Sequence, residues 1–308
     1  MKRKIIISSG DPAGIGPIIS LEAIKNSNLN TIDFFLIGDS YIFESIPLFR
    51  RLKGRINFID LKTPGIRNLQ KGSASKLSGK ASIGYLNKSL ELIKAKLASK
   101  LITAPISKEA VEKNILNFKG HTEYLRKYFA LRTTAMMMVS KKMRLVLLTR
   151  HQPLKKVSSL IKADKVKETI CLIHKSLKSQ FKIKRPKIAL ASFNPHAGVD
   201  TFFGNEERTL IKAAKMSRIP VFGPYPADTI FIESNLNKFD SVICTYHDQA
   251  MIPFKLLSFY DGVNLTLGLP IIRTSPAHGV AYDLINKNKR PISSSMEAAI
   301  KLAVDLSS

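Results

Sequence analysis

The sequence predicts an α/β protein whose sheet is mostly parallel. Short apolar runs rich in Ile, Leu and Val alternate with longer amphipathic segments along the 308 residues, and this alternation is typical of layered βαβ units. Gly, Pro, Asp and Asn punctuate the ends of the apolar runs, as expected for turns. The turn at Lys141–Arg144 joins two adjacent apolar runs, which predicts that part of the sheet is antiparallel. A chain of this length can form one large domain or two ordinary ones.

The first third of the chain contains three expected strands, a loop and two helices. The strands are expected at Lys4–Ser9, Asp33–Ile37 and Ile56–Asp60. A helix should start at about Ile18, and the polar stretch Lys71–Lys80 is interpreted as a loop. An amphipathic helix is expected at about 83–98, because apolar side chains recur there at helical spacing.

The remaining two thirds of the chain continue this alternation. Strands are expected at Lys100–Thr103, Ala135–Val139, Arg144–Thr149, Lys187–Ser192, around Val221, at Ser241–Thr245 and at Val263–Leu267, which is the last of them. Helices are expected at about 162–180, 205–217, 248–257 and 294–306.

The chain is strongly basic. Lys and Arg outnumber Asp and Glu by 49 to 23, giving a formal net charge of +26, so nucleic-acid binding has to be considered. The basic residues are scattered singly or in pairs, however, and no helix-turn-helix, zinc-finger or RNA-binding signature accompanies them. We therefore favour a general lysine bias, whose positive field would help to attract a phosphorylated or carboxylated substrate.

Cysteine usage and hydropathy predict a soluble, cytoplasmic protein. Cys171 and Cys244 lie in apolar segments without CxxC spacing and are expected to be reduced core residues. The apolar run Ile5–Ile7 stops at Ser8, which is too short for a signal peptide. No run approaches the roughly 18 apolar residues that a membrane span needs.

The first turn, Gly10–Gly16, is rich in glycine but lacks the spacing of a dinucleotide-binding fingerprint. Glycines allow the backbone to approach a ligand closely, and the N-terminus of the helix beyond the turn favours an anion. We interpret the turn as an anion site, with a plain tight turn as the alternative.

Histidines are concentrated in turn-like runs. They are His121 in Gly-His-Thr-Glu, His151 in Arg-His-Gln-Pro, His196 in Asn-Pro-His-Ala-Gly, His247 in Tyr-His-Asp-Gln and His278 in Ala-His-Gly. Several of these runs follow an expected strand, and side chains beyond the carboxyl ends of strands line the ligand crevice of open α/β sheets. His151, His196 and His247 are the best metal-ligand candidates. A hydrogen-bonded structural role is the alternative for each one.

Three further polar residues follow in the sequence. Lys255 lies one helical stretch beyond His247, and Asn264 and Arg273 are expected to flank the next strand. Lys, Asn and Arg together could hold a phosphate or carboxylate, and the Arg fork can bind such a group through two hydrogen bonds. A solvated lysine is the alternative for Lys255.

The motifs also resemble a known family. Gly-Asp-Pro-Ala-Gly-Ile-Gly-Pro, Gly-His-Thr-Glu, Asn-Pro-His-Ala-Gly, Gly-Pro-Tyr-Pro-Ala-Asp-Thr, Tyr-His-Asp-Gln and Gly-Val-Asn-Leu-Thr-Leu-Gly-Leu-Pro-Ile-Ile-Arg-Thr-Ser occur in this order. In this respect the chain resembles the 4-hydroxythreonine-4-phosphate dehydrogenases of pyridoxal phosphate biosynthesis, from about residue 5 to the C-terminus. The resemblance implies a homodimer of two α/β/α domains, similar in fold to isocitrate and isopropylmalate dehydrogenases, with the active site in the interdomain cleft. The expected domains are 1–125 with 270–308, and 126–269.

The resemblance also implies roles for particular residues. The metal ligands would be His151, His196 and His247, in a site shared between subunits, and the substrate contacts would be His121, Thr122, Lys255, Asn264 and Arg273. We expect His247 and Lys255 to take part in catalysis. The cofactors implied are NAD or NADP and a divalent cation (Zn, Mg, Co or Mn), with the cofactor-binding residues left open.

The implied reaction is oxidation of 4-phosphooxy-L-threonine to 2-amino-3-oxo-4-phosphooxybutanoate, which decarboxylates to 3-amino-2-oxopropyl phosphate. One alternative is a related dehydrogenase of another phosphorylated or carboxylated hydroxy acid. The other is a non-catalytic basic protein that binds anions or nucleic acid. The chain departs from the family pattern at Ile18, Ser107, Val199 and Ala277, and Ala277 matters most because a carboxylate beside a histidine tunes its tautomer and basicity.

Overall fold

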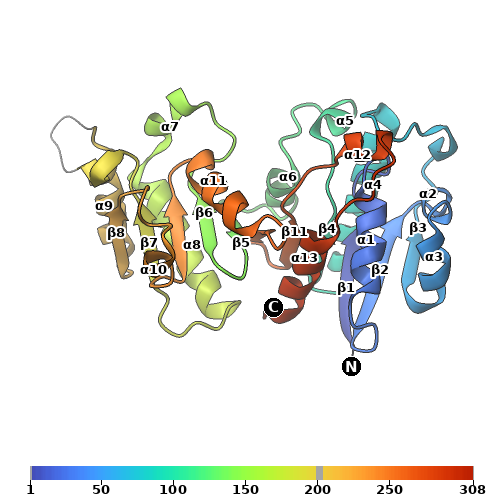
Figure 1. Cartoon of the computed structure of the whole chain (residues 1–308), viewed down its shortest axis with the longest axis horizontal. Coiled ribbons are helices and arrows are strands. Elements are labelled where there is room, and N and C mark those ends of the chain that lie inside the picture. Colours follow the sequence, from blue (N-terminus) through green and yellow to red (C-terminus); the bar gives the residue numbers. More distant parts are fainter. Residues whose placement is uncertain (1, 199–203, 308) are drawn as a thin grey trace. The chain divides into compact units, whose positions relative to one another are not determined.

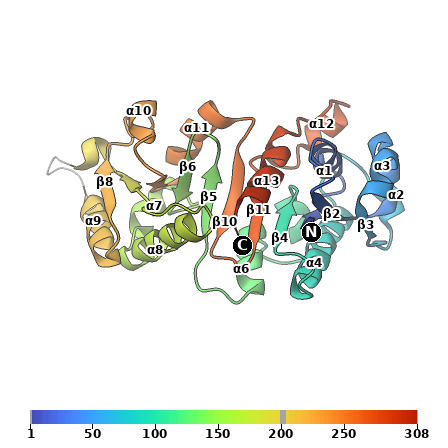
Figure 2. The same cartoon turned by 90° about the horizontal axis from the view of Figure 1, so that it is seen from below.

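The computed structural model describes residues 2–198 and 204–307, and the chain divides into two compact units. The first unit comprises the residues through Leu125 together with Ile271–Leu306, and the second comprises Arg126–Pro270. Each unit is a sheet with helices on both faces (Figure 1 and Figure 2). The expected α/β class with a mixed, mostly parallel sheet is confirmed.

In the first unit the strand order is β3-β2-β1-β4-β11, and the strands pair in parallel. The strands are β1 (Arg3–Ser8), β2 (Ile32–Gly38), β3 (Asn57–Asp60), β4 (Lys100–Thr103) and β11 (Ile272–Pro276). β1 lies in the middle, where Ile6 is paired with Phe35 on one side and Leu101 on the other. Ile5, Ile6 and Ile7 are fully buried, as expected for a strand that is covered on both faces.

Helices cover both faces of this sheet. They are α1 (Gly16–Lys25), α2 (Ser40–Glu44), α3 (Pro47–Leu52), α4 (Lys76–Lys94), α5 (Lys108–Glu112), α12 (Tyr282–Asn286) and α13 (Ser294–Asp305). Figure 2 shows α1 and α13 on one face and α4 on the other. The α13 helix is tied to the sheet because the Thr274 hydroxyl of β11 donates a hydrogen bond to the Ala299 carbonyl at 2.9 Å.

The α4 helix begins earlier than its composition suggests, so the second half of the expected loop Lys71–Lys80 is helical. Two serines form a capping box: the Ser78 amide donates to the Ser75 hydroxyl at 3.0 Å, and the Ser75 amide donates to the Ser78 hydroxyl at 3.2 Å. A Cβ on Gly79 would lie 1.9 Å from the Ala110 carbonyl oxygen. The small residues that resemble a loop are therefore required for close packing against α5.

In the second unit the strand order is β10-β5-β6-β9-β7-β8. The strands are β5 (Ala135–Val139), β6 (Arg144–Leu147), β7 (Ile188–Ala191), β8 (Val221–Tyr225), β9 (Ser241–Cys244) and β10 (Val263–Leu267). β5 runs antiparallel to both β6 and β10, and the other pairs are parallel. Val139 faces Arg144 across the turn, which confirms the predicted antiparallel pair.

The helices of the second unit include α7 (Leu154–Leu160), α8 (Ala163–Ser179), α9 (Glu206–Ser217), α10 (Glu233–Leu236) and α11 (His247–Ser258). α6 (His121–Tyr128) begins in the first unit and ends in the second. Figure 2 shows α8 and α9 on one face of the sheet and α10 and α11 on the other. This arrangement leaves the carboxyl ends of β6, β9 and β7 at one edge.

The sheet contains one strand that was not predicted. Val263–Leu267 is not the last strand, because another strand follows it. Ile272–Pro276 forms β11, in which Thr274 pairs with Ile102 of β4. The expectation that Asn264 and Arg273 flank a strand is therefore wrong: Asn264 lies within β10 and Arg273 lies within β11. The run Arg273-Thr274-Ser275 is polar, so its composition does not predict burial. It is buried because neighbouring elements cover it.

Both cysteines are free. Cys244 is fully buried in β9, and burial raises the pKa of its thiol. Cys171 on α8 is partly exposed, so the expected core position is right for Cys244 and only partly right for Cys171. Within residues 2–198 and 204–307, no helix combines the length and the apolar character needed to cross a membrane.

Candidate active site

In the second unit two of the three predicted metal-binding histidines lie together. β6 and β9 are parallel neighbours, so the segments that leave their carboxyl ends start side by side. Thr149 reinforces this contact, because its amide and its hydroxyl donate to the Thr245 carbonyl at 3.2 and 2.7 Å. Beyond these residues the rings of His151 and His247 approach each other, with centroids 5.1 Å apart and planes inclined by 39°.

The turn that carries His247 is held by a buried glutamine. The Gln249 side-chain oxygen accepts hydrogen bonds from the Thr245 amide and hydroxyl at 2.7 and 2.9 Å. Its nitrogen donates to the Ser192 carbonyl at 2.6 Å. Gln249 thus links the turn after β9 to the end of β7, and it fixes the start of α11, where His247 is the first residue.

Asp248 is the immediate partner of His247. The Nδ1 atom of His247 lies 2.6 Å from Oδ1 of Asp248, and the tautomer that carries its proton on Nδ1 donates a hydrogen bond to this carboxylate. In that tautomer the Nε2 atom of His247 is the electron-pair donor. Carboxylates commonly orient metal-binding histidines in this way. Asp248 was not among the predicted site residues, although it follows His247 directly in the sequence.

His196 occupies a different kind of turn. It lies in the 3-10 turn η3 (Pro195–Gly198), where His196 and Ala197 both have left-handed backbone angles, with φ of 51° and 56°. Glu207 holds the preceding segment, accepting hydrogen bonds from the Phe193 and Asn194 amides at 2.9 and 2.7 Å. Glu207 is a positioning residue that the sequence analysis missed.

The described residues do not form a complete three-residue metal site. Among residues 2–198 and 204–307, no three or more His, Cys, Asp or Glu side chains are grouped so that they could hold a metal ion. The His151–His247 pair nevertheless has the chemistry of a divalent-cation site, since imidazole is a common metal ligand and Asp248 orients one ring. His151 and His196 are exposed at the surface of the chain, so a further ligand can reach them.

In the first unit Arg273 is a buried cation. Its side chain is only 2% exposed, and its Nε donates a hydrogen bond to the Thr103 hydroxyl at 3.0 Å. β11 pairs with β4 so that Arg273 reaches the end of β4, where Thr103 is the last residue. Burial lowers the pKa of Arg273 to about 9, although the nearby charge of Glu123 raises it. A guanidinium in this position would be stabilised by a bound anion.

His121 lies beside this cation, at the start of α6. Burial, and then the charge of Arg273, lower the pKa of His121 well below 6.5, so the imidazole is neutral at physiological pH. Its Nε2 atom is buried and has no hydrogen-bond partner among the described residues. Thr122 follows and is also buried. Arg273, His121 and Thr122 therefore form a polar corner within one unit.

The other two predicted substrate residues belong to the second unit. Lys255 on α11 is partly buried, burial lowers the pKa of its amine, and the amine lies 5.4 Å from the centre of the Phe259 ring. Asn264 on β10 pairs with Met138 of β5. The Oδ1 atom of Asn264 is buried without a hydrogen-bond partner in the described part of the chain, so it can accept a hydrogen bond from a ligand.

The first turn has a structural role. Four of its amides are satisfied inside the protein: Asp11 donates to the Pro105 carbonyl, Ala13 to the Asp11 carboxylate, Gly14 to the Asp11 carbonyl and Ile15 to the Val280 carbonyl, at 2.8 to 3.1 Å. These amides cannot bind an anion, so the interpretation of Gly10–Gly16 as an anion site is wrong for them. The Tyr282 hydroxyl donates to Asp11 Oδ2 at 2.6 Å, and burial raises the pKa of Asp11.

Two of the four departures from the family pattern have local roles in the backbone. Ser107 caps α5, since its hydroxyl accepts a hydrogen bond from the Ala110 amide at 3.2 Å. The Ala277 amide donates to the Ser295 hydroxyl at 2.9 Å. The neighbouring His278 places its Nδ1 atom 3.1 Å from the Gly279 carbonyl oxygen, so this ring has a backbone partner.

Of the other two departures, Ile18 is a partly buried apolar residue of α1. Val199 lies outside the described residues.

Comparison with known proteins shows matches over nearly the whole chain. Residues 17–303 match the family model described as pyridoxal phosphate biosynthetic protein PdxA. A 4-hydroxythreonine-4-phosphate dehydrogenase from Desulfosudis oleivorans is 36% identical over 97% of this chain and 94% of its own length. The D-threonate 4-phosphate dehydrogenase of Salmonella typhimurium is 34% identical over 99% of both chains. The crystal structure of a 4-hydroxythreonine-4-phosphate dehydrogenase from Klebsiella pneumoniae superposes with a TM-score of 0.83, at 29% identity and 99% coverage of both chains.

Proposed function

This chain belongs to the family of the pyridoxal phosphate biosynthetic protein PdxA, and from that membership we propose that it oxidises 4-phosphooxy-L-threonine. It is a dehydrogenase that acts on a CH–OH group. In the proposed reaction, the C3 hydrogen leaves as a hydride to NAD or NADP and the hydroxyl proton is released. The product, 2-amino-3-oxo-4-phosphooxybutanoate, then loses CO₂ to give 3-amino-2-oxopropyl phosphate.

The observation that carries this proposal is the buried polar corner around Arg273. A guanidinium that is 2% exposed lies beside a neutral His121 whose Nε2 has no partner among the described residues. An anionic substrate group would accept hydrogen bonds from Arg273, and His121 would supply a further polar contact. The substrate has two anionic groups, the phosphate and the carboxylate. We propose that Thr122, Lys255 and Asn264 also bind it.

The histidines His151, His196 and His247 would hold a divalent cation in this proposal. Zn, Mg, Co and Mn are all candidates, and a bound cation would polarise the reacting hydroxyl. The protein's own contribution is orientation, because Asp248 fixes the tautomer of His247 and Gln249 fixes the turn that carries it. Since burial lowers the pKa of Lys255, its amine is suited to exchange a proton with the substrate hydroxyl.

The proposed assembly is a homodimer, because α11 and the residues after it expose a large apolar surface. Its members are Ile252 (61% exposed), Leu256 (80%), Leu257 (41%), Phe259 (60%) and Tyr260 (62%). Contiguous apolar surface of this kind marks an interaction site, and a two-fold axis would bury the same patch of both subunits. A second subunit could also complete the metal site that the described residues of one chain leave incomplete.

The dimer is tested by light scattering on the Leu256→Glu variant. We expect a dimeric wild type and a monomeric variant that has lost high-affinity cation binding. Ile211→Glu on α9 is the control, since Ile211 is 39% exposed and α9 lies on the opposite face of the sheet from α11 (Figure 2), and it should leave the dimer intact. A wild type that stays monomeric at high concentration would exclude the proposed assembly.

The reaction is tested by following reduction of NAD and NADP with 4-phosphooxy-L-threonine and each divalent cation, with and without a chelator. Turnover that the chelator abolishes and added cation restores is expected. His247→Ala should remove this turnover, and wild-type rates in that variant would refute the role of His247. Detecting 3-amino-2-oxopropyl phosphate among the products tests the decarboxylation separately.

A second candidate substrate is D-threonate 4-phosphate, because dehydrogenases named for it are as similar to this chain as several of the relatives named for 4-hydroxythreonine 4-phosphate. The two substrates differ at C2, which carries an amino group in one and a hydroxyl group in the other. Measuring kcat/KM for both distinguishes them. A clear preference for D-threonate 4-phosphate would reassign the substrate while leaving the dehydrogenase class intact.

A further inference from the structure

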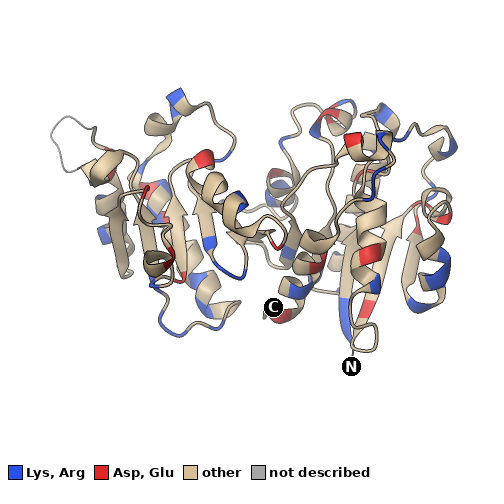
Figure 3. Cartoon of the chain, in the orientation of Figure 1, with Lys and Arg blue, Asp and Glu red and all other residues tan. Residues whose placement is uncertain are grey.

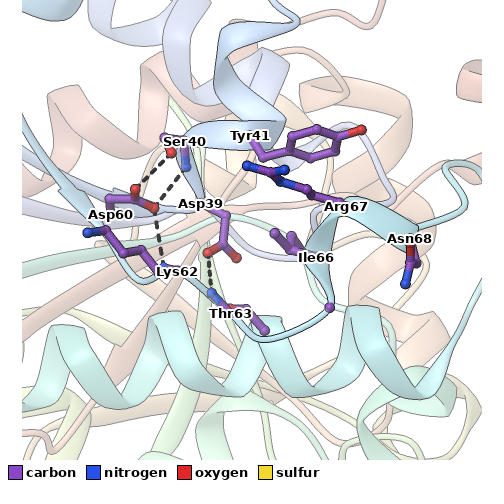
Figure 4. A pocket seen from close by; sticks show the side chains of 10 residues that line it. Asp39, Ser40, Tyr41, Asp60, Lys62, Thr63, Ile66, Arg67 and Asn68 are labelled. Carbon is purple, nitrogen blue, oxygen red and sulfur yellow. Dashed lines mark hydrogen bonds between the residues drawn. The ribbon is translucent and has the colours of Figure 1, made fainter.

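A separate pocket lies beyond the carboxyl ends of β2 and β3 in the first unit (Figure 4). Its volume is about 560 Å³, which is in the range of small-molecule sites. Its polar lining includes Asp60, Lys62, Thr63, Arg67 and Asn68, together with the ring of Tyr41. None of these residues is among the predicted metal or substrate contacts. We call this cavity the β2–β3 pocket.

The floor of the β2–β3 pocket is rigid. Asp39 is 1% exposed, and its carboxylate accepts hydrogen bonds from the Tyr85 hydroxyl and the Thr63 amide, both at 2.6 Å. Asp39 is therefore satisfied and serves to build the site. Thr63 is 5% exposed, and its hydroxyl has no hydrogen-bond partner in the part of the chain that the structure describes. A buried hydroxyl without a partner is costly, so its place in a pocket wall points to a ligand.

One wall of the pocket is a fixed carboxylate. The Asp60 carboxylate accepts hydrogen bonds from the Ser40 amide at 2.9 Å, the Ser40 hydroxyl at 2.7 Å and the Lys62 amide at 3.3 Å (Figure 4). Burial raises the pKa of Asp60, but these hydrogen bonds and the charge of Lys62 outweigh it, so the pKa lies below its usual value. A carboxylate has about four acceptor positions, which leaves capacity for a ligand hydroxyl or amino group.

The pocket also contains two positively charged side chains, Lys62 and Arg67. Lys62 and Arg67 are exposed, and their side chains make no hydrogen bond or ion pair within residues 2–198 and 204–307. Basic residues also surround the pocket in sequence, at Arg50, Arg51, Lys53, Arg55 and Lys71. Figure 3 shows blue segments gathered around α3 and the loop that follows β3. Exposed Lys and Arg side chains at one cavity favour a phosphate group.

Tyr41 adds an aromatic face. Its side chain is 49% exposed and lines both the β2–β3 pocket and an adjoining cavity of about 410 Å³. An exposed ring between two cavities offers a surface on which a flat heterocycle can stack. The Arg67 guanidinium, drawn near Tyr41 in Figure 4, is a second planar group of the same pocket.

From these features we propose that the β2–β3 pocket binds a small phosphate ester that carries an aromatic ring. The phosphate is bound by Lys62 and Arg67, the ring contacts Tyr41, and a ring or sugar hydroxyl donates to Asp60. Nucleoside monophosphates and phosphorylated pyridines share this chemistry. The site is independent of the proposed dehydrogenase site and is suited to an effector that is not consumed.

The test is calorimetric titration of the full-length protein with AMP, pyridoxine 5′-phosphate and inorganic phosphate, each with and without saturating NAD. We expect saturable binding of at least one ring compound that NAD does not displace. Arg67→Ala should weaken that binding about tenfold, since it removes a charge-assisted contact. Tyr41→Ala should weaken the binding of the ring compound and leave the affinity for inorganic phosphate unchanged.

Arg55→Ala is the matched control, because Arg55 is an exposed cation of the same segment that does not line the pocket. This variant should bind the ring compound with the same affinity as the wild type. The three variants should keep wild-type dehydrogenase rates, so a failed titration is distinguishable from a failed enzyme assignment. Absence of saturable binding by both ring compounds overturns the proposal. So does binding that NAD displaces or that Arg67→Ala and Tyr41→Ala leave unchanged.

Discussion

Replacing Arg273 by Met should separate stability from substrate binding. The guanidinium is 2% exposed, and burial lowers its pKa from 12.5 to about 9. At about 1.36 kcal/mol for each pH unit, keeping this side chain charged in the folded state costs roughly 5 kcal/mol without a bound anion. Met removes that cost, and loss of the hydrogen bond to Thr103 offsets about 1–3 kcal/mol of the gain.

The expected net result is a free energy of unfolding for Arg273→Met that exceeds the wild-type value by about 2–4 kcal/mol, measured by urea denaturation without substrate. KM for the phosphorylated substrate should rise by at least tenfold, because charge-assisted hydrogen bonds contribute about 1.5–3 kcal/mol each. Arg290→Met is the control: Arg290 is exposed and pairs with Glu22, so both quantities should stay close to wild type.

A clear loss of stability in Arg273→Met, larger than about 2 kcal/mol, would refute the reasoning, because it would mean that the guanidinium stabilises the empty protein. An unchanged KM would contradict the proposed role of Arg273 in binding an anionic substrate group. Circular dichroism of both variants at the same pH shows whether the fold is retained.

Three further predictions concern the two units separately. Asp248→Asn should weaken cation binding about 10- to 100-fold by calorimetry, because His247 loses the carboxylate that fixes its tautomer; equal affinity would show that Asp248 does not orient the ring. Glu207→Ala should lower the free energy of unfolding by about 1–3 kcal/mol, since it leaves the half-buried Phe193 and Asn194 amides without this acceptor. An effect below about 0.5 kcal/mol would argue against this anchor. His121 has a pKa well below 6.5 when folded, so the unfolded chain binds the proton first and stability falls as the pH drops below about 6.5; His121→Asn should flatten that fall, and an unchanged pH profile would contradict it.

Much of the fold could be predicted from local patterns. A strand buried on both faces needs a continuous apolar run, which is why β1 was expected close to its observed position. The antiparallel turn at Lys141–Arg144 could be predicted because it is too short for a crossover between parallel strands. The approach of His151 and His247 follows from the same logic, because both leave the carboxyl ends of neighbouring strands.

Other features depend on partners that are distant in the sequence. β11 was missed because its polar residues are buried through pairing with β4 and packing under α13. The start of α4 was assigned to a loop because Gly79 and its small neighbours are needed for contact with α5. The amides after Gly10 could not be recognised as occupied, since their acceptors include Pro105 and Val280.

The sequence by itself therefore determined the class of fold, the position of most strands and the residue types available for chemistry. The tertiary structure decided which of those groups are desolvated and which are satisfied. Arg273 shows the difference: its identity is visible in the sequence, but its burial and lowered pKa arise from its place in β11 beside Thr103 of β4. Desolvation and hydrogen-bond satisfaction depend on atoms that only folding brings near, so no local pattern can contain them.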